Sequence, residues 1–219
     1  MRIELGALRE TPFVGIFAIA TEKFVLVPKT ISAKEEKRVA GLFGAEIVKA
    51  SIANSGLLGV LAAGNSRGIV AGSVLEEKEE KELLDAGIRV KIVENFSAVG
   101  NLLEINDSKG VCAGAFSEKQ RKAMEKFLGV KLMVATIAGS DIVGAGIVAT
   151  NKGFVLNKMA SDKEAKEIER HFGIQGAKAT ANAGDCFLGN SLIANSDAAL
   201  AGINTTGFEL ARIDEGLRG

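Results

Sequence analysis

A cysteine beside an acidic residue is the one arrangement in this chain that could support covalent catalysis. Cys186 directly follows Asp185, and a thiol becomes an effective nucleophile when a neighbouring base or cation converts it to the thiolate. The single histidine, His171, falls in a predicted outer helix, at the position where two sister helices carry Leu42 and Phe127. We therefore expect His171 to be a partly buried helix residue far from Cys186, which leaves the thiol without a base.

The same residue types give no basis for a metal site. Cys112 and Cys186 lie 74 residues apart, a separation that fits no zinc motif, and the chain has one histidine. We expect both thiols to be reduced, as in cytosolic proteins. The prediction is therefore no metal, no cofactor and no catalytic residue.

The charge balance argues against a protein that grips nucleic acid mainly through its phosphates. The 219 residues include 27 basic and 27 acidic side chains, whereas phosphate neutralisation requires a basic surplus. Tryptophan and tyrosine, two of the usual platforms for stacking bases, do not occur.

Composition predicts a soluble, cytoplasmic protein with a large core. Apolar residues make up 47 % of the chain and the mean hydropathy is +0.21. No apolar run approaches the ~18 residues of a membrane-spanning helix. The N-terminal residues 1–4 include an acid and begin no signal-peptide stretch. We expect a monomer with no membrane association.

A short motif, two apolar residues followed by a glycine, recurs five times. Its copies are Phe13-Val14-Gly15, Leu57-Leu58-Gly59, Ala98-Val99-Gly100, Ile142-Val143-Gly144 and Phe187-Leu188-Gly189. The glycines lie 44, 41, 44 and 45 residues apart, and a period of this length indicates a repeat array with one supersecondary unit per period.

Each unit has the same predicted elements. A short apolar strand opens at the glycine, near 16–20, 60–63, 102–105, 147–149 and 192–194, and small residues there suit strands crowded around a common axis. An Asn-, Asp- or Gly-containing turn then leads back into a second apolar strand, near 24–27, 69–71, 111–113, 154–156 and 199–201. A third strand is expected at 47–53, 90–93, 132–138 and 177–183.

A charged amphipathic helix is predicted between the second and third strands. Four helices begin with a capping box, formed by Ser32 and Glu35, Ser117 and Gln120, Ser161 and Glu164, and Thr206 and Glu209. The second unit's helix begins near Glu76 with an acidic first turn. Glycines at 44, 87, 129 and 173 are expected to end the first four helices.

The fifth unit lacks a third strand, and residues 1–12 match the missing piece. Ile3 lies twelve residues before Gly15, as Ile47 lies twelve before Gly59. We predict that the N-terminal strand pairs with the last repeat and closes a ring. The prediction is one domain, 1–219, with repeats at about 13–56, 57–97, 98–141, 142–186, and 187–219 together with 1–12.

A ring of five such units resembles the pentein, or α/β-propeller, superfamily, and within it the archaeal translation initiation factor 6 family. The resemblance covers the whole chain. It rests on Asn54-Ser55, Ser97-Ala98-Val99-Gly100-Asn101, Thr150-Asn151-Lys152-Gly153, Thr180-Ala181-Asn182, Gly189-Asn190 and the terminal 205–210 segment Thr-Thr-Gly-Phe-Glu-Leu.

The resemblance implies a non-enzymatic factor that binds the large (50S) ribosomal subunit on its joining face. There it would block the small (30S) subunit, and it would also take part in maturation of the large subunit. The implied contact is a large-subunit ribosomal protein near the sarcin–ricin loop of the RNA. Eukaryotic members carry a regulatory C-terminal tail, and since this sequence stops at Gly219 that regulation is expected to be absent.

The implied binding residues lie in the loops around the recurrent glycines, which must gather at one end of the ring. They are Asn54, Ser55, Ser97, Gly100, Asn101, Asp141, Asn182, Asp185 and Asn190, with Thr11 and Ser140 in the same loops. This set predicts a small, polar interface read through hydrogen bonds with apolar contacts among them. The alternative is that these side chains only cap their own turns.

Two further function classes stay open. Guanidine-modifying penteins use a cysteine, a histidine and acids in the central cavity, so the superfamily allows a hydrolase that uses Cys186. An interaction module with another partner is the third class. Lys91 and Arg67 could add RNA contacts at the rim of the interface. The mixed charge runs 76–82 and 117–126 are expected to be solvated helix faces.

Overall fold

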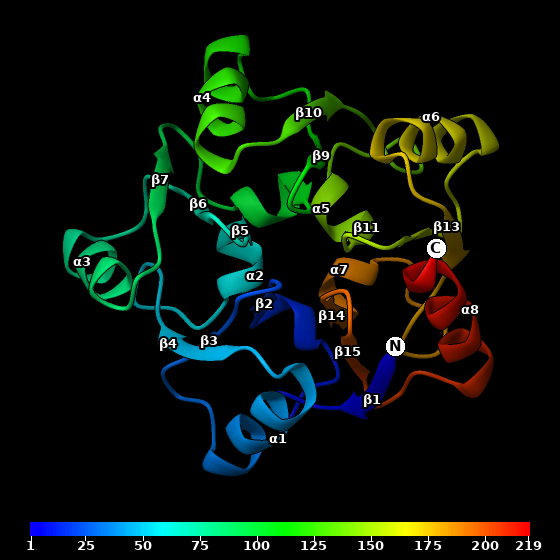
Figure 1. Ribbon diagram of the computed structural model, residues 1–219, viewed down its shortest axis with the longest axis horizontal. Helices are drawn as coiled ribbons and strands as arrows, with labels where there is room; N and C mark the ends of the chain where they lie inside the picture. The colour runs from blue at the N-terminus through cyan, green and yellow to red at the C-terminus, as the bar shows by residue number, and fades with distance from the viewer.

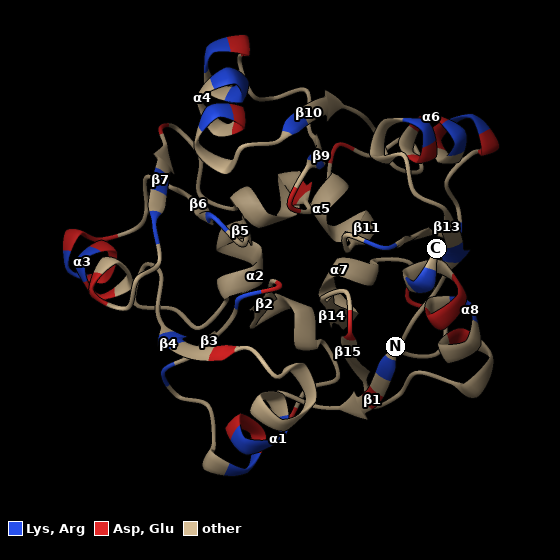
Figure 2. Cartoon of the chain, in the orientation of Figure 1, with Lys and Arg blue, Asp and Glu red and all other residues tan.

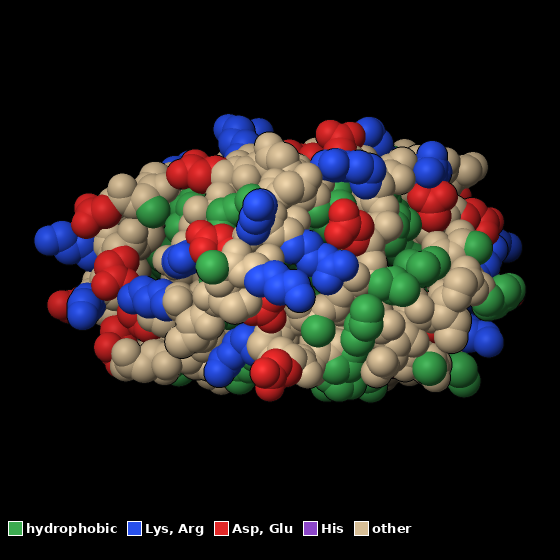
Figure 3. Space-filling view, turned by 90° about the horizontal axis from the view of Figure 1, so that it is seen from below, with side chains coloured by type: hydrophobic (Ala, Val, Ile, Leu, Met, Phe, Trp, Pro, Cys, Tyr) green, Lys and Arg blue, Asp and Glu red, His purple; other side chains and the backbone are tan.

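Five similar units surround a central axis and form a flattened disc (Figures 1 and 3). The structure, a computed structural model, describes all residues 1–219. Each unit runs from a one-turn helix at the axis through two strands to a long outer helix and then to an outer strand. This is the five-fold α/β-propeller that the repeat predicts. None of its helices has the length and apolar character needed to span a lipid bilayer.

The element bounds follow the chain order. The first unit contains η1 (Val14–Ile16), β2 (Ile19–Ala20), β3 (Phe24–Pro28), α1 (Ala33–Phe43) and β4 (Glu46–Ala50). The second contains α2 (Leu58–Leu61), β5 (Ala62–Asn65), β6 (Gly68–Gly72), α3 (Glu77–Asp85) and β7 (Val90–Val93). The third contains η2 (Val99–Leu102), β8 (Leu103–Ile105), β9 (Lys109–Cys112), α4 (Glu118–Leu128) and β10 (Lys131–Val134).

The last two units repeat this order. The fourth contains α5 (Val143–Gly146), β11 (Ile147–Ala149), β12 (Phe154–Asn157), α6 (Asp162–Phe172) and β13 (Gly176–Ala179). The fifth contains α7 (Leu188–Ser191), β14 (Leu192–Ala194), β15 (Ala198–Gly202) and α8 (Gly207–Arg218), and β1 (Arg2–Gly6) provides its third strand.

Each unit has its own three-stranded sheet. The inner pair of strands is antiparallel and the outer pair is parallel. β1 pairs in parallel with β15, from Arg2 opposite Ala198 to Gly6 opposite Gly202, so the N-terminal strand does join the last repeat. No continuous sheet runs around the ring, because the five sheets are separate.

The capping boxes form as predicted in α1, α4, α6 and α8, and Glu76 with Glu79 makes a fifth at α3. Gly44, Gly129 and Gly173 end their helices in the left-handed conformation. Each outer helix covers the junction between its own sheet and the preceding one: Leu83 of α3 packs in one cluster with Leu26 of β3 and Ile69 of β6. Lys, Arg, Asp and Glu residues lie mainly on these outer helices, as Figure 2 shows.

The recurrent glycines do not open strands, as the sequence pattern suggests, but sit in the one-turn helices. There each glycine faces the glycine of the preceding unit. A Cβ atom on Gly59 would lie 1.9 Å from the carbonyl oxygen of Gly15, and one on Gly15 would lie 2.0 Å from that of Gly189. The same approach joins Gly100 to Gly59, Gly144 to Gly100 and Gly189 to Gly144. The five glycines therefore form a closed ring of backbone contacts that no residue with a Cβ fits.

A small cavity of about 70 Å³ lies on the axis below this ring, and Glu104 is the one ionisable residue that lines it. Its Oε1 accepts a hydrogen bond of 2.7 Å from the backbone N–H of Ala149. Burial raises the pKa of Glu104 to about 8, although the Ala149 hydrogen bond acts in the opposite direction. The carboxyl group is therefore mostly neutral at pH 7.

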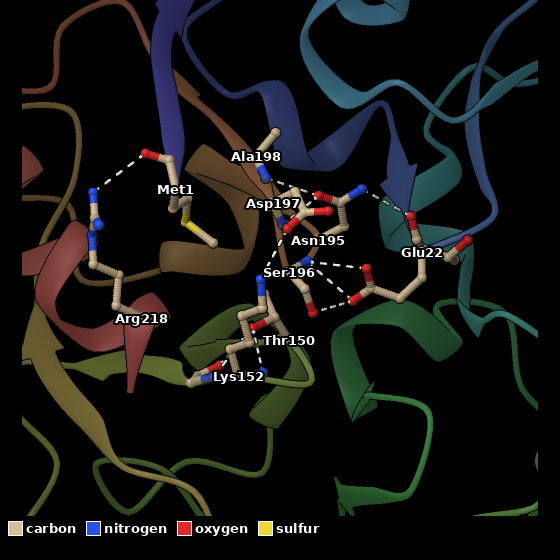
Figure 4. Close-up of polar contacts among 11 residues, drawn as sticks. Met1, Glu22, Thr150, Lys152, Asn195, Ser196, Asp197, Ala198 and Arg218 are labelled. Atoms are coloured by element: carbon tan, nitrogen blue, oxygen red, sulfur yellow. Dashed lines mark hydrogen bonds and ion pairs between the residues drawn. The ribbon is translucent and has the colours of Figure 1, made fainter.

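The hairpin turns close the other end of the axis through a belt of amide groups. Asn65 Nδ2 donates to the Asn106 carbonyl at 3.1 Å, and Asn106 Nδ2 donates to that of Thr150 at 2.9 Å. Asn195 Nδ2 donates to the Thr21 carbonyl at 3.3 Å, so the belt also links the fifth unit to the first (Figure 4). These buried side chains each bond a neighbouring unit, as buried polar groups must.

Gly144→Ala should destabilise the fold by several kcal/mol, on the order of 3 or more, because the added Cβ would lie 1.9 Å from the Gly100 carbonyl oxygen. Gly41→Ala is the matched control: it lies within α1 with no atom within 4 Å of the new Cβ, and should stabilise by about 0.5–1 kcal/mol. Urea denaturation measures both, and equal stability of the two variants would contradict the glycine ring.

Glu104→Gln should raise the free energy of unfolding on the order of 2 to 3 kcal/mol at pH 7. The folded state holds the proton up to a pKa of about 8, while the unfolded carboxyl loses it near 4.5. Wild-type stability therefore falls as the pH rises from about 4.5 to about 8, and Gln removes that fall. Denaturation of both proteins across this range is the measurement. If the difference in unfolding free energy between Glu104→Gln and the wild type did not grow with pH, the raised pKa of Glu104 would be contradicted. The control is Glu167→Gln, which changes an exposed carboxylate.

Candidate functional site

The loops that precede the recurrent glycines lie at the end of the ring opposite the hairpin turns. In four of them two or three consecutive residues have positive φ: Arg9 and Glu10, Ala53 and Asn54, Ala138 and Gly139, and Asn182, Ala183 and Gly184. A bridge closes each turn, such as Ile52 with Ser55. These turns explain why the third strands end earlier than the apolar runs predict, since Ala53, Ala138 and Ala183 belong to the turns.

The acid of each capping box also holds the adjacent loop. Oε2 of Glu79 accepts from the N–H of Ala53 at 2.8 Å and its Oε1 from that of Asn54 at 2.9 Å. Three further acids make equivalent bonds: Glu35 with Arg9, Glu164 with Gly139, and Glu209 with Ala183 and Gly184. One carboxylate therefore fixes both the start of an outer helix and the turn beside it.

The pKa values of these carboxyl groups are lowered by the hydrogen bonds that they accept in this double role. Burial alone would raise the pKa of Glu209, but hydrogen bonds from Thr206, Thr180 and Gly184 outweigh it and lower the pKa to about 2. The pKa values of Glu35, Glu79 and Glu164 are lowered by the same balance of burial and hydrogen bonds. The loops are thus held most firmly when these groups are charged.

The third unit departs from the pattern. Its capping residue is Gln120, whose Nε2 donates to the Glu94 carbonyl at 3.0 Å. Only Asn95 has a positive φ in this loop. The loop that leads to Gly100 and Asn101 is therefore held by no carboxylate. Its carbonyls accept instead, that of Glu94 from Gln120 and that of Phe96 from the N–H of Ser73 at 3.0 Å.

Several of the predicted site residues use their side chains within the chain. Asn54 Nδ2 donates to Oε1 of Glu76 at 2.7 Å. Asn182 Nδ2 donates to the Pro12 carbonyl at 3.0 Å and to Ser191 Oγ at 2.9 Å, and Asp185 accepts from the Phe187 N–H. Thr11, Ser55 and Ser140 accept from the N–H two residues later in the same way. The bonds of Asp185, Thr11, Ser55 and Ser140 are the ones that the turn-capping alternative predicts, whereas Asn54 and Asn182 bond residues outside their own turns.

The remaining predicted residues are free or buried. Asn101 and Asn190 follow the ring glycines directly, are half-buried, and donate no side-chain hydrogen bond within the chain. Ser97 and Asp141 are exposed. Gly100 itself is buried in the glycine ring. The two free amides are thus the polar groups best placed for a partner near the axis.

The predicted set of site residues omits the large apolar side chains that the structure exposes at this end. The first residue of the motif is partly exposed in four units, at 40 % for Phe13, 37 % for Leu57, 42 % for Ile142 and 43 % for Phe187. The second residue is fully buried in all five units. The position of a residue within the motif is the signal by which the sequence could have distinguished the exposed first residue from the buried second one.

Other exposed apolar residues extend the same surface. Val134 is the last residue of the third strand β10. Met159 and Ile203 follow the second strands β12 and β15, which run parallel to the third strands and therefore end on the same side of the ring. Phe208 lies in the first turn of α8. Together with the four motif residues they form what we call the apolar face. Of the nine large apolar residues that are exposed, only Leu84 of α3 lies outside it. Hydrophobic side chains gather in one area at the lower edge of Figure 3.

The thiol and the imidazole do not meet. Cys186 Sγ lies 3.8 Å from the Gly184 carbonyl oxygen. His171 is on α6, where its Nε2 contacts the carbonyls of Gly110 at 2.9 Å and Lys131 at 3.2 Å. The structure therefore gives the thiol no base, and Cys112 is a buried thiol whose pKa burial raises to about 11.

The fold and this surface define a five-unit α/β-propeller with one apolar end. The family model described as "eIF-6 family" matches residues 3–216, and the chain therefore belongs to the eIF-6 family. Translation initiation factor 6 of Pyrococcus abyssi is 32 % identical over 99 % of both chains. That of Methanosarcina mazei is 33 % identical over 95 % of this chain and 94 % of the relative.

A third relative, translation initiation factor 6 of Staphylothermus marinus, is 32 % identical over 100 % of this chain and 99 % of its own. Among solved structures, C. jejuni agmatine deiminase matches with a TM-score of 0.40 and 13 % identity. That match covers 55 % of this chain and 49 % of the deiminase. The curated relatives support a role as a translation initiation factor.

Glu209→Gln should destabilise the protein at pH 7 by about 3 kcal/mol or less, because its carboxylate accepts hydrogen bonds from Thr206, Thr180 and the adjacent loop. The depressed pKa makes this contribution complete above about 4.5 and lost as the pH falls toward 2. The wild-type advantage should therefore shrink on acidification.

The exposed Glu215 of the same helix supplies the control, since Glu215→Gln removes an equal charge from an exposed pair with Arg212. Denaturation curves of the three proteins between pH 7 and about pH 2.5 give the comparison. Equal effects of the two substitutions would refute the role of Glu209.

Proposed function

We propose that this protein binds the large (50S) ribosomal subunit through the apolar face and thereby prevents the small (30S) subunit from joining. It would act in the cytoplasm as a monomer, and it would also take part in maturation of the large subunit. The relatives named translation initiation factor 6 support a role at initiation. The proposal needs no catalysis, and it gives Cys186 no chemical role.

The single observation that carries the proposal is the one-sided distribution of apolar side chains. Eight of the nine exposed large apolar residues belong to the apolar face. Scattered single apolar residues are normal on a monomer, whereas a surface that collects them at one end marks an interaction site. Aromatic anchors such as Phe13 and Phe187 are enriched where binding energy concentrates.

The polar groups at this end favour a protein partner over naked RNA. The five loops before the glycines contain one basic residue, Arg9, whose guanidinium stacks over the ring of Phe17. An RNA partner would require several free cations there. The free amides of Asn101 and Asn190 instead suit hydrogen bonds to a protein backbone or side chain.

Steric occlusion follows from the shape of the molecule. A disc that lies with one face on the joining surface of a subunit leaves its other face and its rim in the space that the second subunit would fill. No conformational change in the factor is required, and the glycine ring holds the five loops in fixed relative positions. Release would then depend on weakening the contact at the apolar face.

Phe187→Glu should weaken large-subunit binding at least tenfold, because it places a charge among apolar contacts that become desolvated. Charged substitutions at Asn101 or Asn190, such as Asn101→Glu, should also weaken it. Co-sedimentation with purified large subunits measures binding, and sucrose-gradient profiles with both subunits measure inhibition of joining.

Leu84→Glu is the matched control, since Leu84 is 51 % exposed but lies outside the apolar face. It should bind and inhibit like the wild type. Wild-type-like binding by Phe187→Glu, Asn101→Glu and Asn190→Glu together would exclude this face as the interface. A wild-type protein that failed to sediment with the large subunit would refute the function itself.

A further inference from the structure

A surface pocket of about 390 Å³ lies at the hairpin end, far from the apolar face, between the first and second units. Three cations line it, Lys23 from one hairpin, Arg67 from the next, and Arg89 from the segment between α3 and β7. Glu46 is the one acid among its lining residues. Arg67 is therefore not at the rim of the apolar face, where the sequence had suggested an RNA contact.

The two guanidinium groups are held in place by the end of α4. Arg67 Nη1 donates to the Leu128 carbonyl at 3.1 Å. The guanidinium carbon of Arg89 lies 4.7 Å from the centre of the Phe127 ring, a cation–π contact. The backbones are also coupled, since the N–H of Ile69 donates to the Arg89 carbonyl at 2.9 Å. Both side chains are thus positioned before any ligand arrives.

The charge of the pocket is uncompensated. Lys23, Arg67 and Arg89 are exposed, and none of them belongs to an ion pair of the chain. In the neighbouring hairpins, by contrast, Lys152 pairs with Asp197 at 2.9 Å. Three unpaired cations against one acid in a concave site attract anions.

We propose that this pocket binds a phosphate group, supplied by an RNA backbone or by a free phosphate. Arginine forks match the geometry of phosphate oxygens, and lysine adds a mobile point charge. Structural roles at the end of α4 account for the bond of Arg67 to Leu128 and for the contact of Arg89 with Phe127, but they do not account for Lys23 beside them. The site goes beyond the proposed function, because it occupies the opposite end of the ring.

The test uses the double variant Lys23→Glu/Arg89→Glu and a fluorescently labelled single-stranded RNA of about ten nucleotides, at about 50 mM salt. Anisotropy should show wild-type binding that the double variant loses at least tenfold. Lys23→Glu alone, which alters a side chain without intramolecular partners, should weaken binding about threefold, so that the result does not depend on the fold tolerating Arg89→Glu.

Lys166→Glu on α6, far from the pocket, is the control for Lys23→Glu, since both change the charge by the same amount, and it should bind RNA like the wild type. Inorganic phosphate as competitor separates the sources: displacement at low millimolar phosphate with no preference for RNA indicates a free anion, and weak displacement indicates a backbone. No wild-type binding of either probe, or equal loss in Lys166→Glu, would overturn the proposal.

The double variant should sediment with the large subunit like the wild type, which keeps this test separate from that of the apolar face. Loss of large-subunit binding in a double variant with an unchanged melting temperature would overturn the claim that the pocket is a distinct site.

Discussion

The close approach of five glycines around the axis is the constraint on which the structure depends. Each glycine lies where a Cβ would fall about 2 Å from a neighbouring carbonyl oxygen, so the inner helical turns can approach closely enough to seal the ring. That approach places the five inner strands side by side and leaves a small central cavity. It also fixes the direction in which every loop leaves the axis, and the loops carry the apolar face.

A second device links the outer layer to the same loops. In four units a capping carboxylate, that of Glu35, Glu79, Glu164 or Glu209, accepts hydrogen bonds both from the start of its own helix and from the neighbouring turn. A charge-assisted bond of this kind is stronger than a neutral one, and it transfers the rigidity of the helix to the loop. The third unit uses Gln120 in place of a carboxylate, so the loop before Asn101 has no charge-assisted bond to its outer helix.

The two ends of the ring are chemically different, although every unit contributes to both. At the hairpin end, amides such as Asn106 and Asn195 bond the adjacent unit, and charged residues follow them in the same turns, Asp107 in one and Asp197 in the other. At the loop end, apolar side chains such as Phe187 face outward. The two ends differ because of the strand order. In each unit the hairpin turn lies at one end of the strands, and the loop before the next glycine lies at the other. A ring with two unlike faces suits a factor that attaches by one side.

The order of elements, the ring of five units and the capping boxes could all be predicted from the sequence, because they depend on local chemistry. Ser161 and Glu164 three residues apart satisfy helix-end amides wherever they occur, and a glycine at each period marks a position without a Cβ. Tertiary structure alone decided that these glycines lie in helical turns, since the reason is a carbonyl of another unit. It also decided that Phe187 is exposed while Leu188 is buried, and that Asn182 is bonded while Asn190 is free. Exposure and hydrogen-bond partners depend on the neighbouring unit, which no local pattern of residues describes.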